Sequence, residues 1–292
     1  MYTLMHVVAC AFLLVEISQH AATQAADSVE EIMKRVAANQ DRAQELRSAF
    51  VYDQEIMIRF FRGDGKLARE EIRQYSVTPA PGSTDKTLAH FQGKYETGGK
   101  YVDYSEPGFR HKDIDLDGDL MDSFADDFAN EQGSRDGISA DMFPLSSKAQ
   151  ASYRFSLQGR EKYRGREVYR IQFKPVEKNW DDSPWAGTIL VDTHEYQPVM
   201  VTTRMARNLP LFVRTILGTN VKGLGFKIDY ERFDEGLWFP VSYGGEFDLR
   251  AVFFYKRRMA IVLRNQGFQR ARVDARVTFQ EPPIGEPGPS RP

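Results

Sequence analysis

A run of alternating aspartates is the feature of this sequence that most resembles a site for chemistry. Residues 113–120 read DIDLDGDL. The candidate metal ligands in this run are Asp113, Asp115, Asp117 and Asp119. Carboxylates at alternate positions can converge on one hard cation, and the glycine after the third allows the sharp turn of a calcium loop.

This calcium loop is incomplete, so the sequence leaves two interpretations open. Its twelfth position would be Phe124, which cannot supply the bidentate carboxylate, although Asp122, Asp126 and Asp127 follow nearby. The other interpretation is an acidic segment that caps the next helix, because carboxylates are favoured at the positive end of a helix dipole. A Ca²⁺-dependent enzyme is accordingly the weakest of the functional hypotheses.

Other catalytic arrangements have no local support in the sequence. After the N-terminal apolar run the histidines are His90, His111 and His194, and none has metal-ligand spacing. No HExxH or GxSxG motif occurs, and no glycine-rich loop precedes a clear helix start. The one cysteine, Cys10, lies within the apolar run. We therefore predict that the protein is not an enzyme and needs no cofactor.

Composition and charge indicate the class of protein and its division into a signal peptide, one domain and a tail. The chain has 292 residues, 39 basic against 41 acidic, so a strong attraction to nucleic acid is not expected. Residues 1–26 predict a secretory signal peptide, because Val7–Val15 is apolar but too short to span a bilayer and small residues follow it. The alternative is a buried N-terminal helix. Residues 27–280 predict a single domain, and residues 281–292 a disordered tail rich in proline and glycine.

The elements that would position a site are mainly strands. Apolar and polar residues alternate in 153–158 and again in 169–174, and the turn at 163–166 joins them as a hairpin. A capping box at Ser28 starts a helix over 27–48, and helical spacing predicts a second over 117–130. Roughly ten strands and two or three helices in separate groups predict an α+β fold with an antiparallel sheet.

The order of these elements resembles that of a known superfamily. The helix over 27–48, the strand from Ala49, the segment Gly187–Asp192 and the turn into Tyr196–Val199 are similar to the LolA/LolB-like outer-membrane lipoprotein-sorting superfamily. The resemblance implies a curved antiparallel sheet, an incomplete β-barrel, covered by helices. It also implies a periplasmic, non-catalytic protein whose concave apolar face accepts acyl chains. The segment 209–226 and the region 113–144 are additional to the short members.

The resemblance implies that residues on the apolar faces of the strands line a ligand-binding site. The expected lining residues are Phe50, Tyr52, Ile56, Ile58, Phe60, Tyr153, Phe155, Leu157, Tyr169, Ile171 and Phe173, and the expected lid residues are Leu211, Phe212 and Ile216. The expected partner is a lipid or an acylated lipoprotein. The alternative is a cell-envelope module with a filled core that binds a protein partner. Basic residues near Lys256–Arg258 are either a solvated face or a peripheral contact with anionic lipid.

Overall fold

A computed structural model describes residues 27–80, 83–129, 143–176, 185–205, 219–222, 225–233, 236–251 and 255–271. The helices in these ranges are α1 (Val29–Arg47), α2 (Leu116–Ala129) and α3 (Ser147–Gln150). The strands are β1 (Phe50–Phe61), β2 (Leu67–Ala80), β3 (Ser83–Thr97), β4 (Lys100–Tyr104), β5 (Tyr153–Tyr163), β6 (Arg166–Pro175), β7 (Trp185–Asp192), β8 (Pro198–Met205), β9 (Thr219–Lys222), β10 (Lys227–Arg232), β11 (Trp238–Ala251) and β12 (Tyr255–Arg270). Within these described ranges, no helix combines the length and apolar character needed to cross a membrane.

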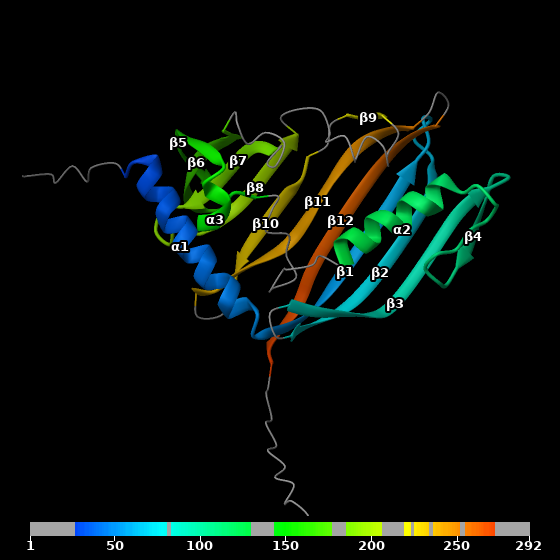
Figure 1. Cartoon of the computed structure of the whole chain (residues 1–292), viewed down its shortest axis with the longest axis horizontal. Helices are drawn as coiled ribbons and strands as arrows, with labels where there is room; N and C mark the ends of the chain where they lie inside the picture. Colours follow the sequence, from blue (N-terminus) through cyan, green and yellow to red (C-terminus); the bar gives the residue numbers. More distant parts are fainter. Residues whose placement is uncertain are drawn as a thin grey trace, which may run out of the picture.

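The strands form one curved, open sheet (Figure 1). It has 12 strands in the order β4-β3-β2-β1-β12-β11-β10-β8-β7-β6-β5, with β9 paired to β11. Every pairing is antiparallel, and the pairing of β1 with β12 joins the run β1–β4 to the later strands. Because β4 and β5 stand at the two margins, the described sheet is not closed into a barrel. The predicted curved antiparallel sheet with helices is confirmed, with twelve strands in place of about ten.

Strand β11 runs without a break through two adjacent glycines, Gly244 and Gly245. A Cβ on Gly244 would lie 2.4 Å from the carbonyl oxygen of Ile261, and a Cβ on Gly245 would lie 2.1 Å from that of Gly225. Both distances are too short for a side chain. These glycines therefore allow close backbone packing inside a strand and do not form a turn.

Strand β12 continues through a buried polar residue. This residue is Asn265, which interrupts the apolar pattern of the strand. The Asn265 side chain donates to the carbonyl oxygen of Pro240 at 2.9 Å, and Gln54 donates to the Asn265 Oδ1 atom at 3.1 Å. These hydrogen bonds satisfy the buried amides, so the strand continues through a polar position.

The register places one apolar row across nearly the whole sheet. Directly paired residues from β5 to β1 are Leu157, Ile171, Ile189, Val201, Ile228, Tyr243, Leu263 and Ile56. We call their face the inner face. The neighbouring row on the other face reads Ser156, Gln172, Thr188, Thr202, Lys227 and Gly244 over the corresponding strands. One face of the sheet therefore carries the core, and the opposite face is largely polar.

The helices cover the inner face (Figure 1). Helix α1 begins where the Ser28 hydroxyl accepts the N–H of Glu31 at 3.2 Å, as the capping box predicts. Its buried residues join those of α2 and the inner row in a single apolar cluster. In α2, the Phe124 ring meets the Phe247 ring edge-on, with centroids 5.9 Å apart. The inner face is thus filled wherever these helices lie on it.

Candidate binding site

Three of the four predicted calcium ligands pair with three different arginines, and the fourth lines a pocket. Asp115 contacts Arg69 at 2.7 Å. Asp117 lies 2.9 Å from Arg257, and Asp119 lies 2.8 Å from Arg110. Asp113 lines a pocket of about 690 Å³ beside them. In the part of the chain that the structure describes, no three acidic, histidine or cysteine side chains form a group able to hold a metal ion.

A buried charge network lies on the inner face of β2. It consists of Arg69, Glu71, Arg73, Tyr104, Asp115 and Asp122. Because strand residues alternate between faces, Arg69, Glu71 and Arg73 all point inward, and their side chains are between 1% and 3% exposed. Arg73 continues the row that is apolar on the other strands, since it pairs directly with Ile56.

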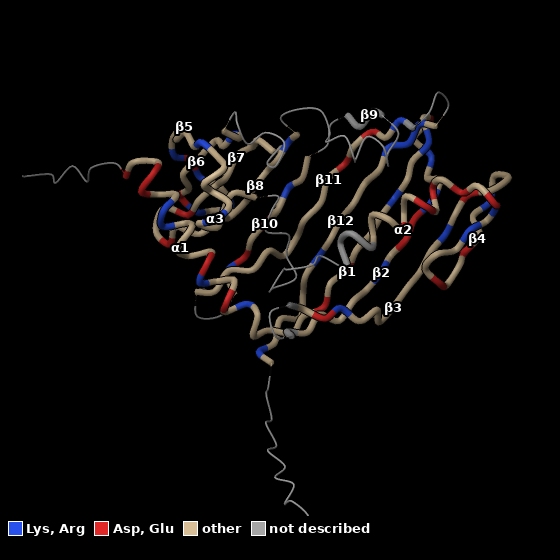
Figure 2. Tube along the Cα trace, viewed as in Figure 1, with Lys and Arg blue, Asp and Glu red and all other residues tan. Residues whose placement is uncertain are grey.

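The network is closed by short hydrogen bonds between its members. Arg69 donates to the Tyr104 hydroxyl and to Asp115, each at 2.7 Å. The Tyr104 hydroxyl donates to Glu71 at 2.6 Å. Arg73 donates to Glu71 at 2.6 Å and to Asp122 at 2.7 Å. Two sheet arginines thereby hold Asp115, just before α2, and Asp122, in the middle of that helix, and this fixes the helix over the inner face. Charged positions gather around α2, β2 and β4 (Figure 2).

The pKa shifts in the network have opposing causes. Burial acts to raise the pKa of Asp115, but hydrogen bonds from Gly118 and His111 and the charge of Arg69 outweigh it, and the pKa is lowered. Burial likewise acts to raise the pKa of Asp122, but hydrogen bonds from Arg110 and Arg73 outweigh this effect, and the pKa is lowered. Both carboxyls are therefore ionised at neutral pH, which keeps the ion pairs intact.

Glycine explains how Tyr104 reaches the network. Gly93 on β3 pairs directly with Tyr104 on β4. A Cβ at Gly93 would lie 2.2 Å from the Tyr104 ring. The ring therefore lies flat across the glycine, and its hydroxyl extends to Arg69 on β2.

Most of the sequence-predicted lining residues are core residues. The side chains of Ile56, Ile58, Phe60, Tyr153, Tyr169, Ile171 and Phe173 are buried in the apolar cluster with the helices. Tyr52 is buried outside that cluster, at the end of the sheet where it contacts Phe268. Leu157 is 36% exposed. Phe155 and Phe173 line a pocket of about 450 Å³ at one end of β5–β8. Leu211, Phe212 and Ile216 lie outside the described residues.

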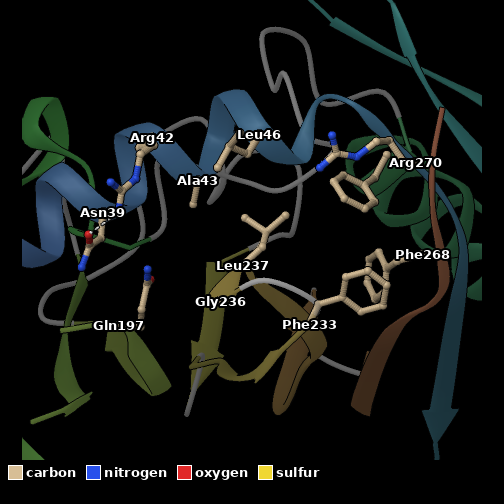
Figure 3. A pocket seen from close by; sticks show the side chains of 11 residues that line it. Asn39, Arg42, Ala43, Leu46, Gln197, Phe233, Gly236, Leu237, Phe268 and Arg270 are labelled. Carbon is tan, nitrogen blue, oxygen red and sulfur yellow. Dashed lines mark hydrogen bonds between the residues drawn. The ribbon is translucent and has the colours of Figure 1, made fainter. Parts of the chain in front are cut away.

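One cavity combines an apolar wall with polar groups, and Phe50 lines it. This α1 cavity, of about 710 Å³, lies between the C-terminal half of α1, the β10–β11 connection and the ends of β1 and β12 (Figure 3). Its lining residues are Asn39, Arg42, Ala43, Leu46, Phe50, Gln197, Phe233, Gly236, Leu237, Phe268 and Arg270. The 690 Å³ pocket beside the charge network is lined largely by charged side chains instead.

Aromatic rings pack together at one end of the α1 cavity. The ring centroids of Phe50 and Phe239 are 5.3 Å apart, and those of Phe239 and Phe268 are 4.1 Å apart. Phe233 meets both Phe50 and Phe239 edge-on. Such packing gives a rigid apolar wall.

Sequence reasoning found Phe50 but missed the other residues of this wall. Phe233 and Leu237 flank the connection between β10 and β11, and Phe268 lies near the end of β12. The only local signal in the sequence was the pair of apolar residues, Phe233 and Leu237, on the two sides of this connection. Helix α1, this connection and the end of β12 are far apart in the sequence, so no local pattern indicates that they meet.

Comparisons with known proteins give matches among solved structures only. No family model matches the chain, and no curated protein matches it. The chain is similar to a putative outer membrane lipoprotein-sorting protein domain from Vibrio parahaemolyticus, with 11% identity, 82% of this chain and 92% of that chain covered, and a TM-score of 0.35. It is also similar to a LolA superfamily protein from Nitrosomonas europaea, with 12% identity, 85% and 96% covered, and a TM-score of 0.35.

A third match is the lipoprotein LppX of Mycobacterium tuberculosis, with 8% identity, 85% and 99% covered, and a TM-score of 0.27. The Nitrosomonas europaea protein is described as a LolA superfamily protein. TM-scores of 0.35 and below are too low to carry an argument about fold or function. The function therefore has to be argued from the residues of the chain itself.

Proposed function

We propose that this chain is an exported, non-catalytic protein that binds a lipid or an acyl-bearing ligand in the α1 cavity. The observation that carries the proposal is the cavity itself, whose volume of about 710 Å³ lies beside a wall of packed phenylalanines. Pockets for small molecules commonly have volumes of roughly 300–1,000 Å³ and mostly apolar walls. An acyl chain gains about 0.8 kcal/mol for each methylene group that it buries.

The rest of the inner face supports this choice of cavity. Under α1 and α2 the inner row is packed with side chains. Over β2 the face carries the charge network, where an acyl chain would separate buried ions from their partners. The cavity between the C-terminal half of α1 and the ends of β1 and β12 is left as the place for an apolar ligand.

The lining groups favour binding over catalysis. Among the described residues, the ionisable side chains of the α1 cavity are Arg42 and Arg270. A guanidinium stays protonated at physiological pH, so neither residue suits general acid–base chemistry. The polar groups of the cavity are therefore better suited to holding a ligand than to transforming it.

Replacing Leu46 with Asp tests the location of the ligand. Leu46 lines the α1 cavity and is 47% exposed, so Leu46→Asp places a charge on its wall at little cost to folding. We expect the affinity for a fluorescent fatty-acyl probe, followed by titration, to fall about tenfold or more. Leu88 on β3 is 38% exposed and lines none of the pockets described above, so Leu88→Asp is the matched control.

Two outcomes of this comparison would count against the proposal. Equal affinity of Leu46→Asp and Leu88→Asp would place the ligand elsewhere. The absence of probe binding by the unchanged protein would contradict lipid binding at any site.

Export is tested by the mass of the mature chain. The signal peptide predicted for residues 1–26 lies outside the described residues. We expect protein recovered from the cell envelope of a bacterial host to begin at Ala26 or Asp27, which mass spectrometry of the intact chain would detect. An intact N-terminus beginning at Met1 on protein retained in the cytoplasm would refute export.

A further inference from the structure

The α1 cavity is graded in polarity along its length (Figure 3). Asn39, Arg42 and Gln197 stand together at one end. Leu46 and Leu237 follow, and the phenylalanines form the other end. A cavity of this kind matches a ligand with one polar end and one apolar end.

Gln197 presents hydrogen-bond donors at the polar end. Its side chain is 6% exposed, and its Oε1 atom accepts from the Gln40 amide at 2.9 Å. No described residue accepts from its own amide N–H groups, and Figure 3 shows that amide pointing toward α1. These N–H groups can therefore donate to a ligand oxygen that enters the cavity at this end.

Arg42 adds a positive charge at the same end. Its guanidinium donates to the Asn39 Oδ1 atom at 3.1 Å. Within the ranges that the structure describes, it has no carboxylate partner at ion-pair distance. The other cavity arginine, Arg270, lies at the aromatic end, where its guanidinium is 5.6 Å from the centre of the Phe50 ring.

We infer that the α1 cavity takes a single-chain amphipath with an anionic head group. This inference rests on the proposed function. The head group receives hydrogen bonds from Arg42 and Gln197, and the chain runs past Leu46 and Leu237 to the phenylalanines. A group the size of a water molecule or a methylene takes roughly 30 Å³. A cavity of about 710 Å³ therefore holds one long chain and its head group but not the three chains of an acylated lipoprotein.

The test compares amphipaths that share a chain and differ in the head group. Hexadecanoate, hexadecanol and hexadecyltrimethylammonium each compete with a fluorescent fatty-acyl probe on the full mature chain, below their micelle concentrations. We expect hexadecanoate to bind about tenfold or more tightly than hexadecanol, because hydrogen bonds to a charged group are the stronger ones. The cation is expected to bind most weakly. A triacylated lipopeptide is expected to compete poorly.

Two arginine variants at opposite ends of the same cavity locate the head group. Arg42→Gln is expected to remove the preference for hexadecanoate over hexadecanol. Arg270→Gln is expected to keep the preference. Melting temperatures of the two variants would check that both are folded.

The possible failures are distinct from one another. Equal binding of the three amphipaths would overturn the anionic head group while leaving lipid binding in place. Loss of the preference in Arg270→Gln but not in Arg42→Gln would overturn the orientation. Strong competition by the triacylated lipopeptide would overturn the single chain. The absence of binding by every probe would refute the proposed function as well.

Discussion

Replacing Arg69 with Met is expected to lower the free energy of unfolding by about 3–5 kcal/mol at neutral pH. The Arg69 side chain is 1% exposed, and it donates to both Tyr104 and Asp115. Methionine fills a similar volume but leaves the buried carboxylate of Asp115 without its guanidinium, and an uncompensated buried charge is strongly destabilising. Urea unfolding followed by circular dichroism measures the loss.

The matched control is Arg258→Met on β12. Arg258 is 61% exposed and lies 3.6 Å from Asp248, which is 53% exposed. Pairs as exposed as this contribute little, so a change within about 0.5 kcal/mol is expected. Equal losses in the two variants would show that the buried network does not stabilise the fold beyond an ordinary surface pair.

The same network gives the stability of the protein a defined dependence on pH. The pKa of Asp115 and that of Asp122 are lower in the folded state than the ordinary value of 3.8. Their contribution is therefore complete above that value and is lost as the pH falls through the folded pKa of each group. Arg69→Met removes one of the groups that lower the pKa of Asp115, so its stability is expected to fall less between neutral and acid pH than that of the unchanged protein.

The strand meander and α1 could be predicted because their signals are local. Alternation in 153–158 and 169–174 placed β5 and β6, and the cap at Ser28 placed the start of α1. Hydrogen bonds between residues far apart in the sequence leave no local signal of this kind. Asn265 is compatible with a strand because Gln54, far away in the sequence, supplies its partner.

The acidic run shows why its role could not be read from its own residues. Alternating carboxylates suit a calcium loop and equally suit a set of separate ion pairs. The deciding residues are Arg69 and Arg257, which lie on β2 and β12, far from the run in the sequence. The inward position of Arg69 follows from the register of β2, which only the folded sheet fixes.

The sequence predicted that an apolar surface would bind the ligand, but it did not predict where on the sheet the candidate cavity lies. The sequence indicated an apolar face covered by helices, and Phe50 belonged to the predicted lining. Side chains fill most of that face, because Ile56, Ile58 and Phe60 are buried in one apolar cluster with the helix residues. The remaining cavity depends on where α1 leaves the sheet, and a periodic pattern carries no information about that position.

Replacing Ile189 with Asn is expected to lower the free energy of unfolding by about 3–5 kcal/mol. Ile189 is 0% exposed on the inner face, paired with Ile171 and Val201. The change removes apolar contacts and buries an amide among residues that cannot bond to it. Urea unfolding of the variant and the unchanged protein measures the difference.

The next residue along β7 supplies the control for that variant, and the comparison tests the two-faced sheet as a whole. Thr188 pairs with Gln172 and Thr202 on the polar face. Thr188→Asn is therefore expected to change the unfolding free energy by less than about 1 kcal/mol. Successive residues of a strand point to opposite faces of the sheet. A large loss of unfolding free energy in both variants would therefore mean that the polar row is also buried against protein. A small loss in both would mean that the inner row is not packed, and the ligand could then lie along the whole inner face instead of in the α1 cavity.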